Sequence, residues 1–382
     1  KDGSAGAQQT LGKMYFDGLG GVEQDRERAA EWFRRAAERG LALAQFNYAV
    51  CLDAGYGIPE DDDEARRWYV KAADQGVLEA QLNAALSYES DGDYSRALQY
   101  FRMAADQGNG AAMRKAGVYL LEGRGAERNV DRAVEYLRAA ATLGEPMSQV
   151  RLADCYQKGI GVPQNYERML NWLWLAAENG IPEAQAKIGF CYSKGIGLAR
   201  DSYTAMKWFR LAADAGYAPA QVALGNAYLE GAGAGRDPAK AVELYRKAAE
   251  QGDELGQFSL AVAYALGRGA EKDLTKAFEW FQRSAAQGYA PAQYNLASYY
   301  EDGLGTEQDL DRAVELYRKA AAQNDPRALV ALGHLHLEGK GVETSPKKAR
   351  QYFLKAVEEG SDEAKEVLRR LAGPRTAGQA EE

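Results

Sequence analysis

Apolar and polar residues follow a helical spacing along this chain, and that spacing recurs many times. The segments that start at Ala44, Ala184 and Ala220 align with one another over their whole length. Equivalent segments start at Ala7, Ala44, Ala80, Ala112, Ser148, Ala184, Ala220, Gly256, Ala292 and Ala328, and a closing half-segment starts at Ala364. From Ala112 onward the spacing is 36 residues. We therefore number ten repeats and give each position as an offset from the first residue of its repeat.

The first part of each repeat predicts a helix with one apolar face. Offset 4 is usually large and apolar, offset 5 is always Gly or Ala, and offset 8 is mostly Tyr. Steps of four place these residues on one helix face, and the small residue indicates that a neighbouring helix comes close there. A Gly-x-Gly such as Gly159 and Gly161 then ends the helix.

The second part of each repeat predicts a second helix. Offset 17 carries Asp, Asn or Ser in most repeats, and Pro238 and Pro346 follow it in two of them. A capping side chain followed by proline is typical of a helix start. We expect the buried face to hold Ala at offset 21, Trp, Tyr or Leu at offset 24, and a small pair at offsets 28 and 29. Gly at offset 32, or Asn324 in one repeat, supplies a left-handed exit.

The third repeat differs from the others. Between Tyr88 and Ala97 it reads ESDGDYSR, four residues shorter than its neighbours and without the Gly-x-Gly loop. We expect a tighter turn between its two helices and a local change in curvature.

The repeated motif reads Ala-Gln-x-x-Leu-Gly-x-x-Tyr, then Gly-x-Gly-Val, then Asp-x-x-x-Ala. It resembles the Sel-one-like repeat (SLR), a relative of the tetratricopeptide repeat, from residue 7 to about residue 372. The resemblance implies an all-α, right-handed α-solenoid of about ten antiparallel helix pairs, with the first helices lining its concave side. We expect residues 1–372 to form this single solenoid, residues 364–372 to cap it and residues 373–382 to be disordered. Members of the family are mostly scaffolds and adaptors.

Composition narrows the function. The net charge of −8 argues against general nucleic-acid binding, which needs a basic surface. No apolar run approaches the roughly 18 residues that could span a bilayer. The chain starts at Lys1 without methionine, so we expect the native protein to continue upstream. A leader there would send it to the periplasm or beyond, and otherwise it would be cytoplasmic; the family pattern and the short loops favour a bacterial source.

Several motifs that resemble metal, nucleotide or calcium sites fit the repeat better. His334 and His336 lie two residues apart, roughly 200° around one helix, so they cannot bind one metal ion together. His336 takes the usual tyrosine position and is expected in the core, whereas His334 should point to the concave side. GAGAG at 231–235 follows a helix and is the ordinary loop, and DDDE at 61–64 is a helix start. No cofactor or metal site is predicted.

The three cysteines, Cys51, Cys155 and Cys191, all occupy offset 7 of first helices. Equivalent positions on neighbouring stacked helices are typically about 8–10 Å apart, too far for a disulfide. We therefore interpret them as small core residues.

The charge pattern predicts a basic strip on the concave face. Offset 3 is uncharged in most repeats but basic in repeats 4 to 6, and offset 10 adds lysine in repeats 5 and 6. The predicted strip consists of Arg114, Lys115, Arg151, Lys158, Lys187 and Lys194. It could bind an acidic segment or an anionic ligand. The alternative is a solvated surface neutralised by neighbours such as Asp154 and Glu183.

Aromatic residues predict a second, apolar interaction surface on the same face. Offsets 2 and 6 carry Phe46, Phe190, Phe258 and Tyr294. Aromatic side chains exposed in a groove favour partner binding. The alternative is that they pack between adjacent first helices.

Together these patterns predict a non-catalytic scaffold that binds an extended peptide or a helix of a partner protein, acidic segments being favoured by the basic strip. Two other functions stay open: a hydrolase or carbohydrate-active enzyme, and a scaffold for assembly or secretion of an anionic polysaccharide. The enzyme would need a cleft where titratable groups converge.

Overall fold

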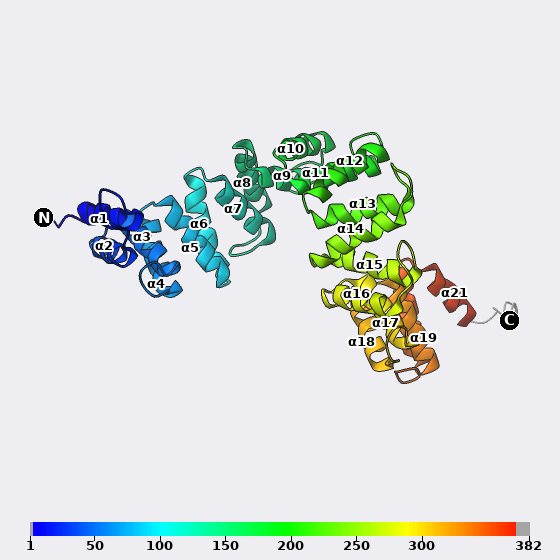
Figure 1. The fold of residues 1–382 in the computed structure, drawn as a ribbon. Coiled ribbons are helices and arrows are strands. Elements are labelled where there is room, and N and C mark those ends of the chain that lie inside the picture. Colours follow the sequence, from blue (N-terminus) through cyan, green and yellow to red (C-terminus); the bar gives the residue numbers. More distant parts are fainter. Residues whose placement is uncertain (1–2, 372–382) are drawn as a thin grey trace, which may run out of the picture. The chain divides into compact units, whose positions relative to one another are not determined.

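The computed structural model describes residues 3–371, and every regular element in that range is an α-helix. The range holds 21 helices, of which twenty pack as ten consecutive pairs, one pair for each repeat (Figure 1). This confirms the predicted all-α solenoid of helix pairs. The chain divides into two compact halves, Lys1–Ala184 and Gln185–Glu382.

The bounds of the helices follow the offsets of the repeats. The first helices are α1 (Ala5–Asp17), α3 (Ala42–Asp53), α5 (Leu78–Ser90), α7 (Gly110–Glu122), α9 (Pro146–Lys158), α11 (Pro182–Lys194), α13 (Ala218–Glu230), α15 (Glu254–Leu266), α17 (Ala290–Asp302) and α19 (Pro326–Glu338). The second helices are α2 (Arg26–Glu38), α4 (Asp62–Asp74), α6 (Tyr94–Asp106), α8 (Val130–Thr142), α10 (Tyr166–Glu178), α12 (Ser202–Asp214), α14 (Pro238–Glu250), α16 (Leu274–Ala286), α18 (Leu310–Ala322) and α20 (Pro346–Glu358). Helix α21 (Asp362–Leu371) is the predicted closing helix.

Local chemistry sets these boundaries. In every repeat from 4 to 10, and in repeat 2, the residue at offset 17 caps the second helix by accepting a backbone N–H from its first turn. At the other end, Asn324 takes the left-handed conformation with φ 64°, as glycine does in the other repeats. The capping residues predicted from the sequence are therefore confirmed.

In repeats 2 and 4 to 10, the core is a large side chain at offset 25 set against the small residue at offset 5. Phe353 is fully buried, and a Cβ added to Gly333 would lie 2.5 Å from its ring. Gly225 is just as close to Tyr245, at 2.6 Å. The prediction that offset 24 would be the large buried position was wrong: Trp68 and Trp280 at offset 24 are only half-buried. Successive residues of a helix point about 100° apart, so a difference of one offset turns the side chain away from the core. Offset 25, not offset 24, faces the small residue of the first helix.

Paired glutamines connect successive repeats. The buried Gln45 donates to the carbonyl of Ala37 in the preceding second helix at 3.2 Å, and Gln75 donates to the side-chain oxygen of Gln45 at 2.7 Å. The same pair recurs in repeats 3, 7, 8 and 9. In repeat 5, Asn179 bonds to its own helix instead, and Gln149 Oε1 is buried without a hydrogen-bond partner among residues 3–371. A buried amide needs such partners, so the pairs fix how one repeat sits on the next.

The third repeat has the short turn that its sequence predicts. Only three residues separate α5 from α6, whereas seven separate α7 from α8. In repeat 4 the loop lies against the start of α6, where a Cβ on Gly125 would be 2.0 Å from the carbonyl oxygen of Tyr94. Within residues 3–371, no such loop covers the start of α4, because only residues 91–93 separate α5 from α6. Arg66 of α4 reaches across instead, bonding to Ser87 Oγ at 2.6 Å and pairing with Asp91.

His336 and the three cysteines are buried, as the repeat predicts. His336 is buried and stacks on Tyr352, while His334 is half-buried against Phe353 with ring centroids 5.2 Å apart. Cys51, Cys155 and Cys191 are buried free thiols. The tail predicted to be disordered, residues 373–382, lies outside the described residues, as does residue 372 of the predicted cap.

Candidate functional site on the first helices

The four predicted aromatics form one type of site on the first helices. Each packs against the offset-25 side chain of its own repeat, with centroids 4.9 to 5.9 Å apart: Phe46 on Tyr69, Phe190 on Phe209, Phe258 on Phe281 and Tyr294 on Tyr317. Phe46, Phe258 and Tyr294 are half-buried, whereas Phe190 is 41% exposed. Each ring is therefore anchored on the core of its own repeat. We call the surface at offsets 2, 3, 6 and 10 of the first helices the first-helix face.

Cavities open beside three of these rings. The first, of about 560 Å³, has Phe46 in its wall together with Lys13, Phe16 and Glu79. The second, of about 190 Å³, has Phe190 in its wall. The third, of about 130 Å³, includes Phe258 and Val262. The sequence located these aromatics but not the cavities.

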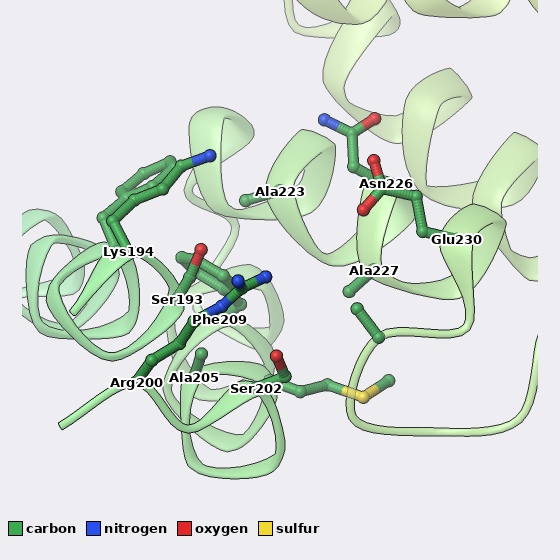
Figure 2. Close-up of a pocket in the computed structure, with 13 residues that line it drawn as sticks. Ser193, Lys194, Arg200, Ser202, Ala205, Phe209, Ala223, Asn226, Ala227 and Glu230 are labelled. Atoms are coloured by element: carbon green, nitrogen blue, oxygen red, sulfur yellow. The ribbon is translucent and has the colours of Figure 1, made fainter.

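The cavity beside Phe190 lies in the C-terminal half, between the end of α11, the start of α12 and the end of α13 (Figure 2). Met206 and Phe209 are almost fully buried and form its apolar floor. Lys194 of α11 and Arg200 of the following loop line one side of the cavity, and Asn226 and Glu230 of α13 line the other (Figure 2). The walls are therefore apolar below and charged at the rim.

Small residues of the seventh repeat create this space. Ala223 at offset 3, Ala227 at offset 7 and Ala232 at offset 12 all line the cavity. Most repeats carry a larger side chain at one or more of these offsets; at offset 12, for example, repeats 5 and 6 carry isoleucine. The GAGAG loop is held over α12, because a Cβ on Gly233 would lie 2.3 Å from the carbonyl oxygen of Ser202. The coincidence of three alanines at these offsets is the signal that could have revealed the cavity from the sequence.

The predicted basic residues lie in different surroundings. In the N-terminal half, Lys115 Nζ is 2.7 Å from Glu89 Oε1, and Arg114 Nε is 3.2 Å from Glu145. Arg151 pairs with Asp154 at 3.4 Å and with Glu183 at 3.3 Å. Lys158 is exposed. In the C-terminal half Lys187 is half-buried, and Lys194 is exposed at the rim of the cavity beside Phe190.

Glu89 is the centre of a small network in the N-terminal half. It accepts hydrogen bonds from Lys115 and, at 2.6 Å, from the hydroxyl of Tyr119. Burial alone would raise the pKa of Glu89. These hydrogen bonds and the charge of Lys115 lower it by more, so the pKa of Glu89 is below its ordinary value. Burial and the neighbouring Glu89 raise the pKa of Tyr119, so its hydroxyl keeps its proton.

The described residues offer no metal centre and no helix for crossing a membrane. Between residues 3 and 371, no three His, Cys, Asp or Glu side chains are grouped so that they could hold a metal ion. Within the same range, no helix has the length and the apolar character that a bilayer span requires.

Comparison with known proteins shows the family. A family model described as Sel1 repeat matches ten times, at residues 5–41, 42–77, 78–109, 110–145, 146–181, 182–217, 218–253, 255–289, 290–325 and 326–361. No match is found among curated proteins.

Two solved structures are similar over most of the chain. One is c5321, a protective antigen of uropathogenic Escherichia coli strains with an SLR fold, which is 33% identical over 96% of this chain and 79% of its own, with a TM-score of 0.69. The other is a Sel1 repeat protein from Oxalobacter formigenes, which is 29% identical over 80% of this chain and 90% of its own, with a TM-score of 0.58. The ten matches span nearly the whole described chain, and so the chain belongs to the Sel1 repeat family.

Proposed function

We propose that this protein is a non-catalytic scaffold that binds a segment of a partner protein along the first-helix face. Repeat proteins of this fold are commonly interaction scaffolds. The observation that supports this role here is that three cavities open beside aromatics of this face, Phe46, Phe190 and Phe258. Aromatic anchors that fit well-packed pockets are among the side chains that contribute strongly to binding at protein interfaces.

The anchoring of these rings favours binding. Because each ring already packs on a buried side chain at offset 25, its conformation is fixed before a partner arrives. A fixed side chain loses little entropy on binding, so more of the contact energy appears as affinity. The cavities recur along the repeats, which suits a partner in an extended or helical conformation.

The basic strip remains a prediction within this proposal. An acidic segment would have to compete with Glu89, Glu145 and Glu183, which already pair with strip residues. Lys158 and Lys194 are exposed and offer the more accessible charges. We therefore expect the aromatics to supply most of the affinity and the charges to contribute to selectivity and to the rate of association.

A phage-displayed library of random peptides, selected on the purified protein, tests the proposal. Selected peptides would be synthesised and titrated against the wild type and against Phe46→Ala and Phe258→Ala variants. We expect at least one variant to weaken binding about tenfold or more, as loss of an aromatic anchor does.

Phe278→Ala is the matched control, because Phe278 is a half-buried aromatic of the same repeat as Phe258 but lies on the second helix, against Tyr300. Its binding should match the wild type, while thermal unfolding reports any loss of stability common to the variants. If no peptide is enriched, or if all selected peptides bind every variant equally, the first-helix face is not the interaction surface.

A further inference from the structure

We propose that the cavity beside Phe190 is a pocket for one aromatic or large aliphatic side chain of a partner segment, and that Lys194 and Arg200 bind a carboxylate next to that side chain. This inference rests on the proposed function and specifies the chemistry of the partner at one position. The pocket lies wholly in the C-terminal half, on α11, α12, α13 and their loops.

The size of the pocket limits its occupant. Its volume of about 190 Å³ is below the roughly 300–1,000 Å³ of sites that enclose small-molecule ligands. It is nevertheless several times the ~30 Å³ that a water molecule occupies. One large side chain on a peptide matches this volume.

The walls of the pocket favour an apolar group. Phe190 and Phe209 meet edge to face at an interplanar angle of 68°, with Met206 beside them on the floor. Phe190 is 41% exposed, more than Phe46, Phe258 and Tyr294, the other predicted aromatics of the first-helix face, which are half-buried. A third ring or a leucine side chain would cover this exposed surface and gain the usual energy of apolar burial.

The charged residues at the rim of the pocket are unevenly distributed. Lys194 and Arg200 lie on one side and Glu230 on the other (Figure 2). Arginines at the position of Arg200 in repeats 4 and 7, Arg128 and Arg236, donate to a carbonyl of their own repeat at 2.9 and 3.1 Å. Arg200 instead lines the cavity. Two cations on one side of an apolar floor favour a carboxylate there, and the low-dielectric wall strengthens the attraction.

Two alanines of the loop after α13 make the inference testable by substitutions that other repeats already carry. Ala232→Ile introduces the residue that repeats 5 and 6 carry at offset 12, so the loop should accept it and the pocket should close. Ala234→Val is the matched control: Ala234 packs against the core without lining the pocket, and repeats 5 and 10 carry valine at its offset, Val162 and Val342.

The probes are capped pentapeptides of sequence Gly-Ser-Phe-Asp-Gly, with Asn in place of Asp and Ala in place of Phe as the two comparison peptides. Binding to the full chain would be measured by saturation-transfer NMR. We expect the Phe-Asp peptide to bind with a dissociation constant on the order of 1 mM, the Asn peptide to bind several-fold more weakly, and the Ala peptide not to bind detectably.

Substitutions in the protein test separately where the phenylalanine ring and the aspartate carboxylate of the peptide bind. Ala232→Ile should abolish the signal of the Phe-Asp peptide, and Ala234→Val should leave it unchanged. The double variant Lys194→Gln,Arg200→Gln should bind the Asp and Asn peptides equally. The control variant Lys207→Gln changes an exposed lysine of α12 beside Tyr203, and it should still prefer the Asp peptide.

The outcomes separate this inference from the proposed function. If library-selected peptides depend on Phe46 or Phe258 but ignore Ala232→Ile, and the Phe-Asp peptide does not bind, the pocket inference is wrong and the scaffold proposal stands. If the Phe-Asp peptide binds but Ala232→Ile has no effect, the peptide binds elsewhere and the pocket inference again fails. If the Asn peptide binds as strongly as the Phe-Asp peptide, Lys194 and Arg200 do not bind a carboxylate of the ligand.

Discussion

Lys115 in the N-terminal half and Lys194 in the C-terminal half look alike in the sequence but differ in their surroundings. Both belong to the predicted basic strip on the first helices. Lys115 Nζ contacts both oxygens of Glu89, at 2.7 and 2.8 Å, whereas Lys194 is exposed at the rim of a cavity. Whether a lysine stabilises the fold or is available to a ligand depends on the carboxylate that another repeat places beside it.

The largest expected effect is the loss of the Lys115 pair. Lys115→Glu would set two carboxylates side by side and remove the hydrogen bonds to Glu89, costing about 2 kcal/mol. Hydrogen exchange measured by mass spectrometry should show faster exchange in α5 and α7, the helices that carry the pair.

Lys158→Glu is the comparison variant, because Lys158 is exposed in the same half. Its effect should stay within about 0.5 kcal/mol. Equal effects of the two substitutions would mean that the Lys115 pair contributes no more than an exposed surface charge.

A smaller effect is expected from the hydroxyl of Tyr119. Tyr119→Phe keeps the ring, which packs edge to face on Phe101, and removes only the donor to Glu89. A hydrogen bond to a carboxylate of this kind contributes about 1 kcal/mol. Thermal unfolding would measure the loss, and the Lys115→Glu,Tyr119→Phe double variant should show that the two losses are not additive, because both act on Glu89.

The network should also make stability depend on pH. Because the pKa of Glu89 is lower in the folded protein than its ordinary value of 4.5, the carboxylate stabilises the fold fully above that value and loses the effect as the pH falls through the folded-state pKa. The difference in unfolding temperature between the wild type and Glu89→Gln should therefore narrow between neutral and acidic pH. A constant difference would show that the charge of Glu89 is not what stabilises the network.

The smallest expected effect belongs to the cations of the cavity. Lys194→Gln and Arg200→Gln should each change the free energy of unfolding by less than about 0.5 kcal/mol, because both residues are exposed. Chemical unfolding would test this. A loss comparable to that of Lys115→Glu would mean that these cations stabilise the fold, and the contrast with Lys115 would disappear.

The sequence predicted those features that depend on neighbouring residues in the chain. Helix starts at offset 17, left-handed exits such as Asn324 and the short turn of repeat 3 all follow from local backbone chemistry. These features fix the period and the helix pairs. The family resemblance then indicated how such pairs stack.

What the sequence could not decide depends on how helices rotate against each other. Offsets 24 and 25 are both apolar, and only the packing of Phe353 against Gly333 shows that offset 25 is the core position. The cavity beside Phe190 likewise depends on how α11, α12 and α13 pack, because the three small alanines leave a cavity only where Phe190, Met206 and Phe209 are set around them. The partner carboxylates of Lys115 and Arg114 lie 26 and 31 residues away in sequence, beyond any local pattern.

The three buried cysteines give each half its own chemical reporter. Burial raises the pKa of Cys51, Cys155 and Cys191 to about 11, and only the thiolate reacts with disulfide or maleimide reagents. Modification must therefore wait until the helix that carries the thiol opens to solvent. Cys51 and Cys155 would report opening in the N-terminal half and Cys191 opening in the C-terminal half, so the labelling rates of the native chain would show, without any engineered probe, whether this array of repeats opens at one end first or as a whole.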